Sequence, residues 1–411
     1  MIIFKLDNGI KVVHMEANSH IAHFGIFVNT GSRDELDQEN GMAHFIEHSI
    51  FKGTKRRKAY HILSRLEGVG GDLNAFTTKE FTCIYASFLN RYYSRALELI
   101  SDITFNSIFP EKEIQKEKEI IIDEINSYLD TPYEHIYDEF EKQVFNGHPL
   151  GRNILGEPDL IRTFRRKDIL GFIRKNYHTQ EMVLCSIGRI KPDRLKNLLV
   201  KYFNSSLKNA QKGPRKIFDS YQQSTRVVEK NSFQNHCMLG NQAYSRRENK
   251  RIAFALLNNI LGGPGLNSRL NLMIRERYGF TYHIESNYQA YTDTGIWGIY
   301  LGTTNGSLDR TINVVHRELK KLRVKKLGVL QLSRAKTQFI GQVAIHLEPN
   351  LNKMLSMGKS LLMDGEIKNM QTISEKIEKV NQEEILEVAN EVFEPDQLST
   401  LIYKSKQNVP A

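Results

Sequence analysis

The chain has few cysteines and no long apolar run. Its three cysteines, Cys83, Cys185 and Cys237, are scattered and form no CxxC pair, so the sequence predicts neither a disulfide framework nor a thiolate metal site. No uninterrupted apolar stretch approaches the ~18 residues that a membrane helix requires. The N-terminus has neither the apolar core nor the cleavage site of a secretory signal. We therefore expect a cytoplasmic protein that does not associate with membranes.

Motifs for nucleic-acid binding are also missing, although the chain carries 57 Lys and Arg against 47 Asp and Glu, a net charge of +10. The basic runs at 165–167, 212–216 and 320–326 are short and lie among helix-forming residues. Such runs are typical of solvated helix faces, so no nucleic-acid partner is predicted. An electropositive cavity that attracts acidic peptides is the alternative interpretation.

Phosphate-binding glycine motifs are absent as well. The run Gly262-Gly263-Pro264-Gly265 is followed by no Gly-Lys-Ser/Thr, and the chain has no GxGxxG. The run instead predicts a sharp turn into a helix that begins near Ser268, whose hydroxyl can cap it.

A weak internal repeat organises the chain, with a constant offset of 216 positions. Each copy predicts a short helix, a second capped helix and a closing strand. Apolar residues match apolar residues and an acid matches an acid. The matching pairs are Ile161 and Ile377, Phe164 and Val380, Asp168 and Glu384, Ile169 and Ile385, and Tyr177 and Phe393.

The repeat predicts two similar domains, 1–210 and 218–411, separated by a polar stretch at 205–218. Alternating residues predict early strands, and helical periodicity follows in each half. The predicted strands are 10–15 and 22–28, and the predicted helices include 60–67, 91–105, 251–261 and 381–392. This order indicates an α+β fold in which each domain is a mostly antiparallel sheet packed with helices.

The clearest chemical motif is His44-Phe45-Ile46-Glu47-His48. Residues four apart lie on one helix face, so both imidazoles can bind a single metal ion. Glu47 lies on the same face and can accept a proton from a water molecule at that metal. Two helical histidines can also simply pack or bond backbone carbonyls, so the motif alone does not decide.

A catalytic zinc site needs a third protein ligand and an open position for water. The run 117–125 offers two acids, Glu117 and Glu124, seven residues apart on one face of a predicted helix. A charged amphipathic helix without a metal has the same pattern. The residues themselves do not distinguish Glu124 from Glu117.

The order HxxEH, with a glutamate 76 residues after His48, resembles the pitrilysin (M16, inverted-zincin) metallopeptidases, which include mitochondrial processing peptidase and insulin-degrading enzyme. The similarity covers most of the chain. Further matching segments are 41–43, 51–54, 71–77, 148–152 with Gly156, 261–263, 268–270 and 275–282. Imidazole and carboxylate ligands also accept manganese or cobalt, so the residues do not select the metal.

The resemblance implies one zinc ion per chain, held by His44, His48 and Glu124, with Glu47 as general base. Glu117 matches an acid that orients a ligand from close by. It also implies that domain 1–210 is catalytic and that domain 218–411 binds substrate.

In the second half, Arg275 and Tyr282 match a pair that such enzymes direct at the substrate. Arg275 would hydrogen-bond a peptide carbonyl or carboxylate, and Tyr282 would stabilise the oxyanion. Without the resemblance, a helix-end arginine and a buried tyrosine would be the simpler interpretation. In the first half, Asn74, Ala75, Phe76 and Thr77 match an edge strand that pairs with the substrate backbone.

These matches predict a zinc metalloendopeptidase that cuts peptides or unfolded segments inside a chamber. Larger family members join four such domains and this chain has two, so we expect a homodimer that supplies Arg275 and Tyr282 across its interface. The alternative is a non-catalytic binding or assembly subunit of a heteromeric peptidase.

Overall fold

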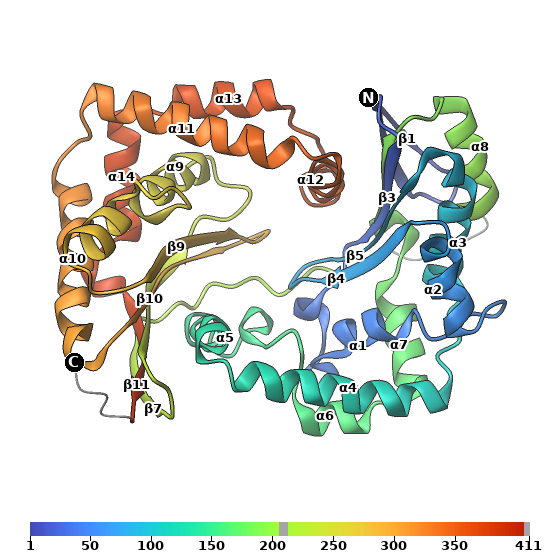
Figure 1. Ribbon diagram of the computed structural model, residues 1–411, viewed down its shortest axis with the longest axis horizontal. Coiled ribbons are helices and arrows are strands. Elements are labelled where there is room, and N and C mark those ends of the chain that lie inside the picture. The colour runs from blue at the N-terminus through green and yellow to red at the C-terminus, as the bar shows by residue number, and fades with distance from the viewer. Residues whose placement is uncertain (205–212, 407–411) are drawn as a thin grey trace. The chain divides into compact units, whose positions relative to one another are not determined.

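The computed structural model describes residues 1–204 and 213–406, which divide into two compact units. Unit 1 comprises 1–126, 152–216 and 345–368, and unit 2 comprises 127–151, 217–344 and 369–411. Each is an α+β unit with a mixed, mostly antiparallel sheet, which confirms the predicted fold class (Figure 1). Within the described residues, no helix combines the length and apolarity needed to cross a membrane.

Unit 1 is built on a six-stranded sheet in the order β1-β2-β6-β3-β5-β4. Every neighbouring pair is antiparallel except β2 and β6. The strands are β1 (Ile2–Lys5), β2 (Lys11–Glu16), β3 (Ile21–Val28), β4 (Asp72–Thr77), β5 (Thr82–Leu89) and β6 (Met182–Gly188). Strand β4 is therefore an edge strand.

Helices cover both faces of this sheet. On one face the chain's first-half helices bury a large apolar cluster, and on the other α12 packs against β3 and β6 through Met354, Met357 and Leu361. Figure 1 shows α12 on one side of the sheet and α2 and α3 on the other. The helices are α1 (Met42–Ser49), α2 (Ala59–Glu67), α3 (Tyr93–Phe105), α4 (Glu111–Leu129), α6 (Pro158–Thr163), α7 (Arg166–Asn176), α8 (Pro192–Phe203) and α12 (Asn350–Met363).

Unit 2 repeats this plan with a five-stranded sheet in the order β7-β11-β8-β10-β9, in which only β7 and β11 run parallel. Its strands are β7 (Thr225–Lys230), β8 (Asn235–Ala243), β9 (His283–Ala290), β10 (Gly295–Thr303) and β11 (Ser399–Ser405). Its helices are α5 (Pro132–Val144), α9 (Arg251–Gly262), α10 (Leu308–Val324), α11 (Val329–Leu347), α13 (Met370–Lys379) and α14 (Gln382–Val392). The edge strand that corresponds to β4 is β9.

The compact units differ from the predicted domains 1–210 and 218–411 by an exchange of segments. Helix α5, from the first half, packs on the sheet of unit 2, and α12, from the second half, packs on the sheet of unit 1. Phe140 of α5 and Met354 of α12 are both fully buried there. The predicted boundary at 205–218 lies partly outside the described residues, so that division remains a prediction.

The repeat has a physical basis in both units. The matched acids cap equivalent helices: the backbone N–H of Arg165 donates to Asp168 at 2.9 Å, and that of Asn381 donates to Glu384 at 2.9 Å. The acid-capped helices α7 and α14 lead into β6 and β11, and each of these strands runs parallel to one neighbour, β2 and β7 respectively. The repeated spacing therefore reflects an equivalent helix start and the core residues behind it.

Candidate metal and catalytic site

Helix α1 carries the HxxEH motif and is held at its N-terminus by a distant acid. Its N-cap is Gly41, whose φ is 95° and which offers no side chain to cap the helix. The buried carboxylate of Glu35 accepts hydrogen bonds from the backbone N–H groups of Gly41 at 3.0 Å and Ala43 at 2.8 Å. Burial raises the pKa of Glu35 to about 8, although the bonds from Ala43 and Gly41 oppose the shift. Through these bonds Glu35 fixes the turn that leads into His44.

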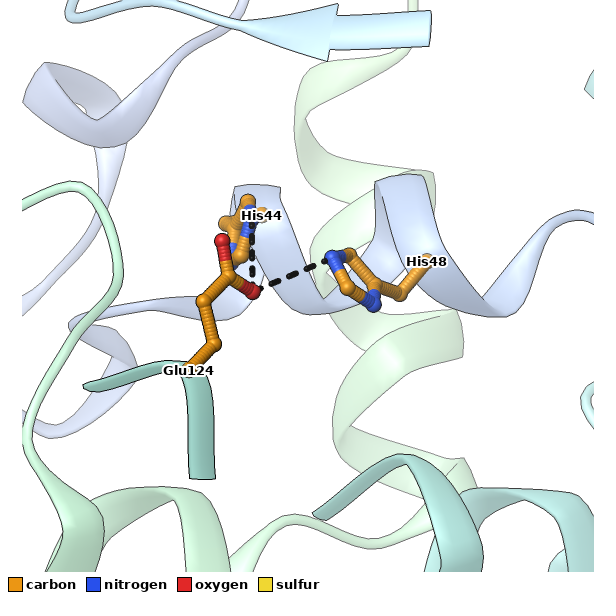
Figure 2. Close-up of side chains that lie close together, drawn as sticks. All are labelled: His44, His48 and Glu124. Carbon is orange, nitrogen blue, oxygen red and sulfur yellow. Dashed lines mark ion pairs between the residues drawn. The ribbon is translucent and has the colours of Figure 1, made fainter. Parts of the chain in front are cut away.

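Three candidate ligands from two helices lie close together. His44 and His48 come from α1 and Glu124 comes from α4, and one donor atom of each lies within 4.8 Å of the others. The Oε2 atom of Glu124 is 3.9 Å from Nε2 of His44 and 3.5 Å from Nε2 of His48 (Figure 2). Two ligands of a tetrahedral zinc ion lie roughly 3.4 Å apart, so this spacing fits a metal ion.

The burial of the His44 ring supports the same interpretation through its protonation state. Burial, followed by the nearby His48, lowers the pKa of His44 to about 3, so the ring is neutral at physiological pH. Neutral imidazole is the form that binds metal. The residues present therefore fit a zinc ion.

Glu117 contacts both His48 and a lysine. Its Oε2 atom is 3.4 Å from Nδ1 of His48, and its Oε1 atom is 2.8 Å from Nζ of Lys52. Burial alone would raise the pKa of this carboxyl, but the contacts with His48 and Lys52 lower it. A carboxylate on the second ring nitrogen leaves Nε2 of His48 free to face Glu124.

Glu47 lies between the candidate metal ligands and the edge strand. The hydroxyl of Thr77, at the end of β4, donates a hydrogen bond of 2.7 Å to Oε2 of Glu47. Burial raises the pKa of Glu47, although the bond from Thr77 opposes the shift. A carboxyl with a raised pKa beside a metal site is suited to proton transfer. The predicted edge strand 74–77 is thus present, while its role in substrate binding remains a prediction.

Arg275 and Tyr282 both belong to unit 2, where they line a cavity of about 420 Å³ together with Gly262 and Gly263. Arg275 lies on a π-helical segment, Asn271–Arg277, a rare conformation that is frequent at functional sites. Tyr282 is 89% exposed, which excludes the interpretation as a buried core tyrosine. The hydroxyl of Ser268 accepts a hydrogen bond from the side chain of Asn271, and its role as a backbone cap remains a prediction.

Two positioning residues escaped the sequence analysis. Lys52 follows His48 by four residues but lies past the end of α1 at Ser49, so helical spacing gave no reliable signal for its contact with Glu117. Glu35 left a weaker signal: the helix start at Gly41 lacks a Ser, Thr, Asp or Asn cap, so its free N–H groups require a hydrogen-bond acceptor from elsewhere.

Comparisons with known proteins show the family to which the chain belongs. Residues 11–158 match the model of insulinase (peptidase family M16), and residues 163–339 match the M16 inactive domain. A protein of Bacillus subtilis named as an uncharacterized zinc protease is 31% identical over 99% of this chain and 99% of its own length. The chain belongs to peptidase family M16. A Rickettsia felis member, also named as a zinc protease, is 32% identical over 97% of each chain.

Two solved structures share the fold of this chain. A protease from Helicobacter pylori has a TM-score of 0.87 at 22% identity, with 98% of each chain covered. The M16 inactive domain from Pseudomonas fluorescens has a TM-score of 0.91 at 18% identity, covering 100% of this chain and 99% of that one. The two-sheet architecture is therefore that of the family.

Proposed function

We propose that this M16 chain is a zinc-dependent endopeptidase that hydrolyses peptides or unfolded segments. The observation that carries the proposal is the convergence of His44, His48 and Glu124, with Glu47 on the same helix bonded to the edge strand. The names of the full-length relatives as zinc proteases support it.

In this proposal His44, His48 and Glu124 hold one zinc ion. When bound, zinc would supply Lewis acidity that polarises the scissile carbonyl and acidifies water. Glu47 accepts the proton of the attacking water and passes it to the leaving amine. Thr77 keeps the Glu47 carboxyl in position through its 2.7 Å hydrogen bond.

The substrate would bind as an added strand on β4. Asn74, Ala75, Phe76 and Thr77 lie on this edge strand, and α1 contacts it directly. Main-chain hydrogen bonds along an edge are largely independent of side-chain sequence, so we expect broad specificity. Glu117 serves by orienting His48.

Arg275 and Tyr282 would complete the site from a second copy of the chain. An exposed tyrosine and a half-exposed arginine beside a cavity are accessible to a peptide held on another subunit. Arg275 would bind a peptide carbonyl or carboxylate, and Tyr282 would donate to the oxyanion. The proposed assembly is therefore a homodimer with one zinc ion per chain.

The deciding experiment compares the wild type with Glu47→Gln on a quenched fluorescent peptide mixture, with bound zinc measured in both. The glutamine oxygen can still accept the Thr77 bond, so the variant removes the base and keeps the packing. We expect one zinc per chain in both proteins and a fall in kcat of about 10²–10⁴ in the variant.

Each other outcome is informative. Zinc in both proteins with cleavage in neither would favour the non-catalytic assembly subunit. Equal cleavage by both would exclude Glu47 as the base, and absence of zinc from the wild type would remove the proposed site.

A further inference from the structure

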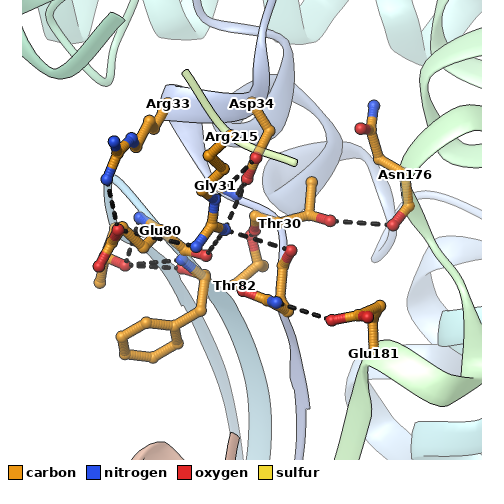
Figure 3. Close-up of polar contacts among 12 residues, drawn as sticks. Thr30, Gly31, Arg33, Asp34, Glu80, Thr82, Asn176, Glu181 and Arg215 are labelled. Atoms are coloured by element: carbon orange, nitrogen blue, oxygen red, sulfur yellow. Dashed lines mark hydrogen bonds and ion pairs between the residues drawn. The ribbon is translucent and has the colours of Figure 1, made fainter. Parts of the chain in front are cut away.

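Residues 213–216, in the segment between the two sequence halves, are built into unit 1 by a buried ion-pair cluster (Figure 3). Its four side chains are Arg33, Asp34, Glu80 and Arg215, which are 1%, 3%, 6% and 14% exposed. Two positive and two negative charges balance one another. Buried charges are tolerated only when they are paired in this way.

Arg215 bridges two loops. Its Nε and Nη2 atoms donate to the two carboxylate oxygens of Asp34 at 2.9 and 2.8 Å, and Nη2 also donates to the backbone carbonyls of Asn29 and Glu80. Asp34 belongs to the loop after β3, and Glu80 belongs to the turn between β4 and β5. Such a two-pronged contact sets orientation as well as distance.

Arg33 binds the backbone of the segment 213–216. Nη2 of Arg33 donates to the carbonyl of Lys216 at 2.6 Å, while its Nη1 donates to Glu80 at 2.8 Å. The two loops also hydrogen-bond directly, from Arg33 N–H to the Lys79 carbonyl at 2.8 Å. A Cβ on Gly31 would lie 2.2 Å from the Thr78 carbonyl oxygen, so the loops are as close as glycine allows.

Each loop adjoins a residue that contacts helix α1 of the proposed site, Glu35 in one case and Thr77 in the other. Asp34 immediately precedes Glu35, whose carboxylate holds Gly41 and Ala43 at the start of α1. On the other loop, the turn that contains Glu80 starts directly after Thr77, the hydrogen-bond donor to Glu47. One guanidinium therefore contacts both the loop that leads to α1 and the turn that follows Thr77.

We propose that Arg215 is a positioning residue for α1 and Glu47, acting through Asp34 and the turn at Glu80. This inference rests on the proposed peptidase function for its kinetic consequence. Its consequence for metal binding does not need catalysis. Without the Arg215 guanidinium, α1 would shift relative to α4, which supplies Glu124, and relative to Thr77 on β4.

The test compares Arg215→Met with a matched control, Arg57→Met. Arg57 also lies in unit 1, is 16% exposed, and also pairs with two carboxylates, those of Glu98 and Asp102. It contacts neither of the two loops through those pairs. A general loss of stability in unit 1 would therefore appear in both variants, whereas a loss of positioning would appear only in Arg215→Met.

For Arg215→Met we expect kcat to fall about tenfold with KM changed less than twofold, and zinc affinity, from chelator competition, to fall about tenfold. Arg57→Met should keep all three values at a temperature where both variants are folded. Arg215→Lys, which keeps the charge but loses the two-pronged contact, should give an intermediate loss and serves if the methionine variant does not fold.

Wild-type kcat and zinc affinity in both Arg215 variants, or equal losses in Arg57→Met, would overturn the inference. If the wild type proves to have no peptidase activity, the proposed function fails separately. Zinc affinity and the hydrogen-exchange rates of the α1 amides would then decide whether Arg215 positions the metal helix.

Discussion

Helix α1 of unit 1 and helix α9 of unit 2 each follow a central strand, and each hydrogen-bonds to the edge strand of its sheet. In unit 1, the Thr77 hydroxyl of β4 donates to Glu47 at 2.7 Å. In unit 2, the Ser286 hydroxyl of β9 donates to Oδ1 of Asn258 at 2.5 Å. The same link between helix and edge strand thus carries an acid in one unit and an amide in the other.

The surroundings of the two links differ more than the links themselves. The Asn258 amide nitrogen donates to the Ser286 carbonyl at 3.0 Å, and the indole N–H of Trp297 donates to both side chains. These polar atoms are satisfied internally, so the network stabilises the fold. In unit 1, the imidazoles beside Glu47 converge on Glu124 at distances that suit a metal. In the proposed function this link serves chemistry in unit 1, whereas the corresponding link in unit 2 stabilises the fold.

Metal removal gives the sharpest test of this difference. Zinc at about 1,000 times its Kd would stabilise the unit that binds it by about 4 kcal/mol, because only the folded site has affinity. We expect chelation to speed hydrogen exchange in α1 and α4 and to leave α9 unchanged. Trp297 is the chain's single tryptophan and is fully buried in unit 2. The unfolding midpoint of unit 2, followed by Trp297 fluorescence, should therefore not change on chelation. Equal loss of protection in both units would contradict the assignment of the metal to unit 1.

The exchanged helices provide the next comparison. Phe140→Ala on α5 should destabilise unit 2 by about 3 kcal/mol, because it leaves a cavity among fully buried residues. Urea unfolding followed by Trp297 fluorescence should shift to lower urea. Met354→Ala on α12 is the control, since it opens a similar cavity in unit 1. An equal shift of the Trp297 transition in both variants would show that the units unfold as one block.

A smaller effect is expected from the proposed contribution of unit 2 to catalysis. Arg275→Ala should lower kcat/KM by about 10–100-fold, the loss expected for one charged hydrogen bond to the substrate. Co-expressed Arg275→Ala and Glu47→Gln chains should recover about a quarter of wild-type activity, because mixed dimers contain one complete site. The control mixture pairs Arg275→Ala chains with Glu119→Gln chains, in which an exposed acid on α4 is replaced. No recovery in the first mixture would rule out a site shared across subunits.

Periodicity and spacing predicted much of this molecule, including the two similar α+β halves and the placement of His44 and His48 on one helix face. Family resemblance was needed to choose Glu124 over Glu117, because both acids share a face of α4 and only packing against α1 separates them. The exchange of α5 and α12 was not predictable, since an amphipathic helix does not encode which sheet it covers. The roles of Glu35 and Arg215 depend on contacts between residues distant in sequence, which single-chain patterns do not record.

The smallest expected effect is a pH response specific to unit 2. His236 is buried on β8, its Nδ1 atom lies 2.7 Å from the Tyr300 hydroxyl, and burial lowers its pKa. The unfolded chain takes up a proton below about pH 6.5 while the folded unit does not. The stability linked to His236 is therefore present above that pH and is lost as the pH falls toward the folded pKa. Urea midpoints from Trp297 fluorescence should decrease between pH 7 and pH 5.5 in the wild type and decrease less in His236→Gln. An identical slope in the two proteins would assign the acid sensitivity to other groups.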